Sequence, residues 1–349
     1  MLIGIDANPA TRSQKTGTEW YTVRLVDALK EVILLSSDEL KLYSRETLKW
    51  PFKRLWTQVR LSWEMLRRPP DVLFVPAHAV PRIHPKKTVT TIHDVGWRRY
   101  PQLYEGKARR YLESTTKFAV KHCAKILTPS EFTKQELITL YHASPEKIVV
   151  TPLAPGHHRI TLSVIQANIP RHFFLTVSRM EAKKNITTLI RAFEMFKERR
   201  GIGDPFQLML VGKPGFGYEQ IRSLIARSPA RESIRELGFI EDQDLAALMA
   251  RATIYVYPSW YEGLGISALE AMAAGVPLIA SDIPALHEAA GDAAVYFDPN
   301  SAESLAHAMT QLVEDIDRRE QMKQQGLERV KELSWEKTAE MTLEVLQLA

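Results

Sequence analysis

The sequence predicts an α/β protein with two doubly wound domains, each built on a parallel sheet that helices cover on both faces. Short apolar runs alternate with longer amphipathic segments, an order typical of consecutive βαβ units. The alternation stops over residues 153–171 and then starts again. A length of 349 residues suits two domains, each with a core of its own.

The first half predicts a domain over residues 1–155. Short runs, several of them apolar throughout as in buried parallel strands, predict strands at 2–5, 72–75, 89–92, 126–127 and 148–150. Amphipathic segments predict helices at 18–31, 107–122 and 131–142, and Ser130 is expected to cap the last of them. Residues 156–171 show no sustained period and are expected to form a linker.

The second half predicts a domain over residues 172–334. Strands are expected at 173–177, 207–211, 237–240, 254–257, 277–280 and 295–297, and helices at 186–200, 218–228, 243–250, 266–274 and 301–314. Residues 335–349 predict a further helix that the second sheet does not need and that is free to pack back on the first domain. Ligands of open α/β sheets bind at the carboxyl ends of the strands, so we expect the site there, in a cleft that both domains face.

Composition limits the class of protein. Hydrophobic residues make up 45% of the chain and charged residues 25%, as in soluble globular proteins. Cys123 is the single cysteine, which excludes a disulfide within the chain. No apolar run approaches the length of about 18–20 residues that a membrane span needs, and the start MLIGIDANPA is typical of a strand rather than a secretion signal. We therefore expect a cytoplasmic protein.

Positive charge is concentrated in the first half, where residues 1–150 hold 25 Lys and Arg against 15 Asp and Glu. Residues 41–70 alone hold eight against two, with Trp50, Phe52, Trp56 and Trp63 interleaved. Such a segment predicts peripheral contact with an anionic membrane. Nucleic-acid binding and a core-packed helix with a basic outer face are the alternatives, and we do not expect nucleic acid as the partner.

The motif PSWYEGLGISALEAMA at 258–273 carries the clearest chemistry. A strand ends at Tyr257, and Gly263 and Gly265 let the backbone approach a ligand closely before a helix begins near Ile266. The helix start offers free N–H groups to an anion, and Glu270 reaches back toward the site that Glu262 approaches. Ionised carboxylates accept hydrogen bonds from sugar or ribose hydroxyls. The plain alternative is a solvated helix with a glutamate near its start.

Glu262 and Glu270, with seven residues between them, resemble the E-x7-E motif of retaining glycosyltransferases of the family-4 type, which have the GT-B fold of two Rossmann-like domains. SRMEAKKN at 178–185 resembles that family's G-R-x-x-x-K-N segment, and the stretches at 5–29, 93–101 and 128–137 are similar to its N-terminal domain. The resemblance covers nearly the whole chain. The departures are Ser178 for the usual glycine, Ile266 and Ser267 for Leu-Pro, and one N-terminal loop glycine, Gly17, where many relatives have two.

The resemblance implies a nucleotide-diphosphate sugar as the donor and a role for each matching residue. Arg179 and Lys184 would grip the diphosphate, Glu270 would hold the ribose, Glu262 would hold the sugar, and His93 would approach the donor sugar from the first domain. The remaining expected donor-binding residues are Gly263, Leu264, Gly265, Ile266, Ser267, Phe239, Ile240 and Gly17. The family needs neither a metal ion nor a cofactor.

Each charged candidate also has a structural alternative. Arg179 and Lys184 suit diphosphate oxygens, and the alternative is a basic surface loop beside Glu181. His93 can be a core histidine with its hydrogen bonds satisfied. The Asp-x-Asp triplets at Asp242 and Asp315 invite a metal site. The first is expected to open a helix and the second to lie at or beside a helix end, which favours helix capping and solvated charge.

These observations predict a retaining, metal-independent glycosyltransferase that moves a hexosyl group, by preference mannosyl, to a glycan or lipid-linked acceptor. It would act in the cytoplasm, peripherally on the inner face of the membrane. Two other classes stay open: another GT-B enzyme such as an epimerase or a phosphorylase, and a non-catalytic protein that binds nucleotide sugars or carbohydrate.

Overall fold

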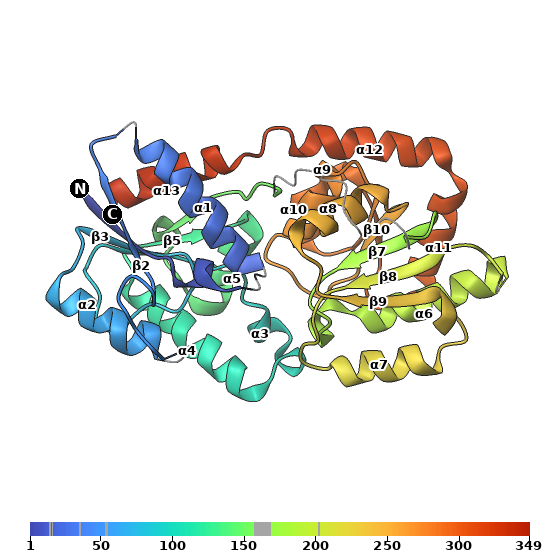
Figure 1. Cartoon of the computed structure of the whole chain (residues 1–349), viewed down its shortest axis with the longest axis horizontal. Coiled ribbons are helices and arrows are strands. Elements are labelled where there is room, and N and C mark those ends of the chain that lie inside the picture. Colours follow the sequence, from blue (N-terminus) through green and yellow to red (C-terminus); the bar gives the residue numbers. More distant parts are fainter. Residues whose placement is uncertain (14, 16, 35, 53–54, 157–168, 202) are drawn as a thin grey trace. The chain divides into compact units, whose positions relative to one another are not determined.

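The computed structural model describes residues 1–13, 15, 17–34, 36–52, 55–156, 169–201 and 203–349. These residues form two compact units, each built on a parallel sheet of six described strands (Figure 1). The first unit comprises Met1–Pro101, Gly106–Ala154 and Leu333–Ala349, and the second comprises Gln102–Glu105 and Pro155–Glu332. The predicted class, two doubly wound α/β domains, is confirmed. Most of the predicted linker, residues 157–168, lies outside the described residues.

The first sheet has the strand order β2-β1-β3-β4-β5-β6. Its strands are β1 (Leu2–Asp6), β2 (Glu39–Tyr43), β3 (Val72–Val75), β4 (Thr88–Thr91), β5 (Lys125–Thr128) and β6 (Ile148–Val150). The middle strands are buried on both faces, which explains their apolar runs. The sequence analysis missed β2, because this edge strand pairs with β1 alone and its polar residues alternate with leucines.

Helices cover both faces of the first sheet: α1 (Gly17–Ile33), α2 (Ser62–Arg67), α3 (Gly96–Arg99), α4 (Gly106–His122), α5 (Glu131–Tyr141) and α13 (Trp335–Leu348). As predicted, Ser130 caps α5 by accepting a hydrogen bond from the backbone N–H of Thr133 at 3.0 Å. α13 runs along α1 (Figure 1), with the ring of Trp335 edge-on to Tyr21 at 5.9 Å. The C-terminal helix therefore completes the first unit.

The basic segment 40–70 is not one helix. After β2 the chain turns, and a π-helical stretch over Trp56–Leu61 leads into α2. Trp56 is buried and its indole N–H donates to Oδ1 of Asp6 at 3.0 Å, which anchors the stretch at the carboxyl end of β1. The core-packed helix that we weighed for this segment is therefore limited to residues 56–67.

The second sheet has the order β12-β11-β10-β7-β8-β9. Its strands are β7 (Phe173–Val177), β8 (Gln207–Val211), β9 (Ile234–Gly238), β10 (Ile254–Tyr257), β11 (Leu278–Ser281) and β12 (Ala294–Phe297). β9 begins three residues earlier than predicted, because Arg235 and Glu236 of this edge strand are exposed and hide the strand pattern. Phe239 and Ile240 consequently follow the strand instead of ending it.

The second unit has seven described helices: α6 (Ile186–Arg200), α7 (Tyr218–Arg227), α8 (Asp242–Arg251), α9 (Ile266–Ala273), α10 (Pro284–Ala290), α11 (Ala302–Glu314) and α12 (Ile316–Val330). Asp242 lies in the first turn of α8, and Asp315 caps α12 by accepting from the N–H of Arg318 at 2.8 Å. Asp242 thus opens a helix and Asp315 lies between the end of α11 and the start of α12, so the expected positions of both Asp-x-Asp triplets are confirmed. None of the described helices combines the length and the apolar character needed to cross a membrane.

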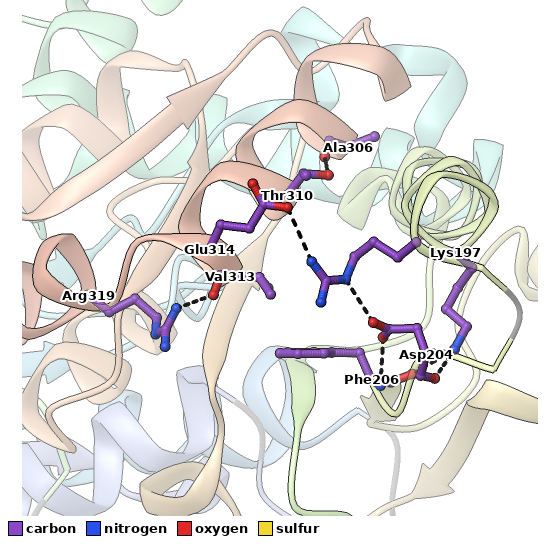
Figure 2. Close-up of polar contacts among 9 residues, drawn as sticks. Lys197, Asp204, Phe206, Ala306, Thr310, Val313, Glu314 and Arg319 are labelled. Atoms are coloured by element: carbon purple, nitrogen blue, oxygen red, sulfur yellow. Dashed lines mark hydrogen bonds and ion pairs between the residues drawn. The ribbon is translucent and has the colours of Figure 1, made fainter.

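A polar cluster fixes the chain after α6 (Figure 2). The buried Lys197 donates from Nζ to the carbonyl oxygens of Asp204 and Phe206, and Asp204 Oδ1 accepts from the N–H of Phe206 at 2.9 Å. Nε of Arg200 lies 2.7 Å from Oδ2 of Asp204, and its Nη1 lies 3.2 Å from Oε1 of Glu314 on α11. These groups partner one another, so the cluster holds α6 and α11 together.

Candidate active site

A buried ion pair lies at the carboxyl ends of two neighbouring strands, β7 and β10. Nζ of Lys184 donates to Oε1 of Glu262 at 2.5 Å, and the side chains are only 14% and 9% exposed. Burial alone would raise the pKa of Glu262, but the positive charges of Lys184 and Lys183 lower it below its ordinary value. Two residues that the sequence placed in one site are therefore in direct contact. The contact itself had no sequence signal, because 78 positions separate them.

The glycine turn before α9 is sterically required. Gly265 has φ +98°, and a Cβ there would lie 2.5 Å from Leu286 and 3.1 Å from the ring of Tyr257. Because Gly265 is the residue before the helix, it has no side chain to cap the first turn of α9. The N–H groups of Ile266 and Ser267, with the positive end of the helix dipole, are thus suited to an anion.

Glu270 joins Glu262 around two buried tyrosines of β10. Burial raises the pKa of both Tyr255 and Tyr257, and the negative charges of Glu262 and Glu270 raise it further. Nζ of Lys184 lies 5.6 Å from the centre of the Tyr257 ring. The structure therefore brings Lys184 and Glu262 together beside Tyr257, and the charge of Glu270 acts on the same two tyrosines. The sequence analysis missed both tyrosines, since IYVY gives only the signal of a buried strand.

Arg179 does not join that group. Its side chain is 59% exposed, and its Nε lies 3.7 Å from Oε2 of Glu181. The loop that carries it packs tightly on the end of β8, where a Cβ at Gly212 would lie 1.7 Å from the carbonyl oxygen of Ser178. Gly215 lies in the segment KPGFG at 213–217, which follows β8. A Cβ at Gly215 would lie 2.8 Å from Cβ of Glu181, so this position is also crowded. The structure explains these glycines by packing between loops.

The candidate base neighbours Phe239 and Ile240 are half-buried after β9. Nζ of Lys213, which follows β8, lies 4.2 Å from the centre of the Phe239 ring. This is close enough for a cation–π contact. One part of the Phe239 surface is thus in contact with a lysine that the sequence analysis did not single out.

The candidates His93 and Gly17 belong to the first unit. His93 follows β4, its Nε2 lies 3.0 Å from the carbonyl oxygen of Pro76, and the ring of Tyr21 meets it edge-on at 4.6 Å. Burial lowers the pKa of His93, so the imidazole is neutral at pH 7. Gly17 starts α1, and a Cβ there would meet nothing within 4 Å among the described atoms. Packing therefore does not demand a glycine at this position.

Sequence comparison assigns both halves of the chain. The family described as Glycosyltransferase Family 4 matches residues 17–154, and the family Glycosyl transferases group 1 matches residues 163–329. The O-antigen chain mannosyltransferase B of Escherichia coli is 32% identical over 272 residues, which are 75% of this chain and 71% of that protein.

Solved structures share the fold over the full length. Sucrose-phosphate synthase from Thermosynechococcus elongatus has a TM-score of 0.81 at 18% identity and covers 100% of this chain and 98% of its own. HepE of Anabaena in complex with UDP and glucose has a TM-score of 0.75 at 16% identity, with 100% and 99% covered. With both halves matched in order and one relative above 30% identity, the chain belongs to the family-4-type glycosyltransferases of the GT-B fold.

Proposed function

We propose that this glycosyltransferase moves a mannosyl group from a nucleotide-diphosphate sugar to a glycan or lipid-linked acceptor, with retention and without a metal ion. The observation that carries the proposal is the group of Lys184, Glu262 and Glu270 beside the glycine-started helix α9. The mannosyl group is supported by the name of the Escherichia coli relative, an O-antigen chain mannosyltransferase. The nucleotide sugar is supported by the HepE structure with UDP and glucose.

The donor diphosphate would lie at the start of α9. Backbone N–H groups, the helix dipole and the ammonium of Lys184 are fixed before the reaction and would stabilise the charge that grows on the leaving nucleoside diphosphate. The exposed Arg179 is free to turn toward the second phosphate, where its fork of donors fits. With these positive groups in place, the leaving group needs no divalent ion. Glu270 would accept from the ribose hydroxyls and Glu262 from the sugar.

Retention would follow from attack on the face that the diphosphate leaves. Glu262 is the carboxylate nearest the proposed sugar position, and its ion pair with Lys184 makes it a poor nucleophile. The acceptor oxygen would therefore bond to the anomeric carbon as the bond to the diphosphate oxygen breaks. The acceptor proton would pass to that departing oxygen, so that no covalent intermediate forms on the protein.

Calorimetry and transfer assays test this proposal. We expect GDP-mannose to be hydrolysed or transferred in excess EDTA, and Glu270→Ala to weaken binding of both GDP-mannose and GDP at least tenfold. Glu320→Ala, an exposed carboxylate on α12, is the matched control and keeps wild-type affinity. Loss of activity in EDTA with recovery in magnesium or manganese would overturn metal independence. Binding of GDP-mannose without any turnover would favour the non-catalytic alternative.

We also propose peripheral membrane contact through an apolar stripe on residues 52–66. Phe52, Leu55, Val59, Trp63 and Leu66 are 62%, 65%, 47%, 53% and 58% exposed. Val59, Trp63 and Leu66 recur every three or four residues and so share one face of the helical stretch that Leu55 precedes, while Trp56, Leu61 and Met65 are buried. The excess of Lys and Arg over residues 41–70 supports an anionic lipid surface as the partner.

Vesicle co-sedimentation tests this second proposal. We expect binding to phosphatidylglycerol vesicles, and we expect salt to weaken it. The double change Trp63→Ser and Leu66→Ser should lower the affinity for these vesicles at least tenfold, because burying each exposed side chain would contribute about 1.5–3 kcal/mol. Leu348→Ser removes a leucine of α13 that is 74% exposed and serves as the control. Equal binding to neutral and anionic vesicles, or tighter binding to RNA than to lipid, would contradict the proposal.

A further inference from the structure

The segment after β3 is fixed against the end of β4 by side-chain hydrogen bonds. Thr90 Oγ1 lies within hydrogen-bonding distance of two carbonyl oxygens, 3.1 Å from that of Val75 and 2.9 Å from that of Ala77. His93 Nε2 lies 3.0 Å from the carbonyl oxygen between them, that of Pro76. The backbone of residues 75–77 is therefore held at the carboxyl edge of the first sheet, and His78 is the residue that follows.

One buried ring nitrogen of His78 has no hydrogen-bond partner among the described residues. This nitrogen is Nδ1, and it is buried although the residue as a whole is half-buried. The ring lies 5.4 Å from that of Trp97, at an angle of 43°. Burial, and then the proximity of His93, lower the pKa of His78 to about 4, so the ring is neutral at pH 7.

The protonated nitrogen of each histidine follows from its surroundings. A carbonyl oxygen only accepts, so Nε2 of His93 carries the proton toward Pro76. For His78, a proton on the buried Nδ1 would leave an N–H unpaired, which folded proteins rarely tolerate. The proton of His78 is therefore on Nε2. Nε2 also has no hydrogen-bond partner among the described residues, yet it is not one of the buried unpartnered atoms, so this side of the half-buried ring reaches solvent.

We propose that His78 is an acceptor-binding residue, whose Nε2–H donates a hydrogen bond to a hydroxyl oxygen of the acceptor sugar beside His93. A neutral N–H suits a hydroxyl oxygen and gives no charge to a phosphate or carboxylate. The site would therefore select an uncharged sugar ring. This inference rests on the proposed function, because it needs transfer to a sugar hydroxyl.

Two substitutions separate hydrogen bonding from packing. His78→Phe keeps a ring beside Trp97 and removes the donor, whereas His78→Gln keeps an amide N–H close to the position of Nε2. His122→Phe, an exposed histidine on α4, is the control. Assays use GDP-mannose as donor and octyl α-mannoside as acceptor, and melting temperatures confirm that each variant is folded.

We expect His78→Phe to raise the KM for octyl α-mannoside about five- to tenfold, the effect of one lost hydrogen bond, while the rate of GDP-mannose hydrolysis and the affinity for GDP stay unchanged. His78→Gln should recover most of the wild-type KM. An unchanged acceptor KM in folded His78→Phe, or hydrolysis that falls as much as transfer, overturns the inference alone. Should His78→Phe not fold, His78→Asn, whose shorter amide does not reach the Nε2 position, replaces it with the same expectations. A wild-type protein that neither hydrolyses nor transfers from GDP-mannose overturns the proposed function instead.

Discussion

Lys184 and Glu262 show how one contact links stability to chemistry. Glu262 is buried and Lys184 is only 14% exposed, and Lys183 is a second positive charge that acts on the carboxylate. Removing one partner of such a pair leaves the other charged inside the protein, at a cost of about 3–5 kcal/mol. The pair is thus a feature that the fold needs, apart from any ligand.

Lys184→Met should lower the free energy of unfolding by about 3–5 kcal/mol at pH 7. Lys184 and Lys183 hold the pKa of Glu262 below its ordinary value, so this stabilisation is present above the ordinary pKa and is lost as the pH falls through the lowered one. The difference between wild type and variant should therefore shrink as the pH falls below the ordinary pKa of a glutamate. Denaturant titrations measure it, and the double variant with Glu262→Gln should recover most of the loss. A double variant no more stable than Lys184→Met alone would refute this account.

The pKa of Asp6 is shifted in the opposite direction to that of Glu262. It is buried at the end of β1 and accepts from the indole of Trp56, yet burial raises its pKa to about 6. The folded state then holds the proton more tightly than the unfolded state, so wild-type stability falls by about 2 kcal/mol as the pH rises from 4 to 6, out of about 3 kcal/mol in all. Asp6→Asn keeps an acceptor for Trp56 and should be the more stable protein above pH 6 but not at pH 4. Melting curves across this range check it, with the exposed Asp27→Asn as control. A difference that does not change with pH would count against it.

At the scale of elements, the sequence predicted the buried strands and the strongly amphipathic helices well. β7, β8 and β10 match their predicted bounds because buried parallel strands are continuous apolar runs. β2 and the start of β9 were missed or misplaced, since edge strands expose polar residues that break the pattern. α10 and α12 were not predicted either, the latter because its surface is mostly charged or polar and only Met322, Gly326 and Val330 are buried.

α13 supports His93 through two ring contacts in series: Trp335 of α13 packs against Tyr21, and Tyr21 packs against His93. Trp335→Ala should therefore destabilise the first unit by about 3–5 kcal/mol through the cavity it leaves. Differential scanning calorimetry should show a transition of the first unit moved to lower temperature and that of the second unit unmoved. Equal shifts of both transitions would show that the two units unfold as one.

At the scale of the whole molecule, the order of the motifs along the chain was more informative about the fold than the residue spacing within any one motif. The E-x7-E motif placed Glu262 and Glu270 correctly after β10, because a glycine turn between a strand and a helix has few alternatives. The charged partner of Glu262, Lys184, came from 78 positions away, whereas Tyr255 and Tyr257 lie in the strand just before the motif. Long-range contacts leave no local pattern, and His78 was missed for the same reason.

Binding should distinguish the two units thermally. If the donor site is in the second unit, GDP at 100 times its dissociation constant should stabilise that unit by about 2.7 kcal/mol. Calorimetry of the Trp335→Ala variant with GDP, where the two transitions are furthest apart, should show only the upper one rising. A nucleotide that raises the lower transition alone would place its site in the first unit.

The return of α13 to the first unit has a consequence for the nascent chain. Residues 1–154 leave the ribosome early, but Leu333–Ala349 belong to the same unit and are made last. At about 5–20 residues per second, residues 155–332 take roughly 10–35 s to synthesise. During that interval the face of α1 that α13 covers, with Tyr21 beside it, is open to chaperones and to other nascent chains. The first unit is thus the first to be made and the last to be finished.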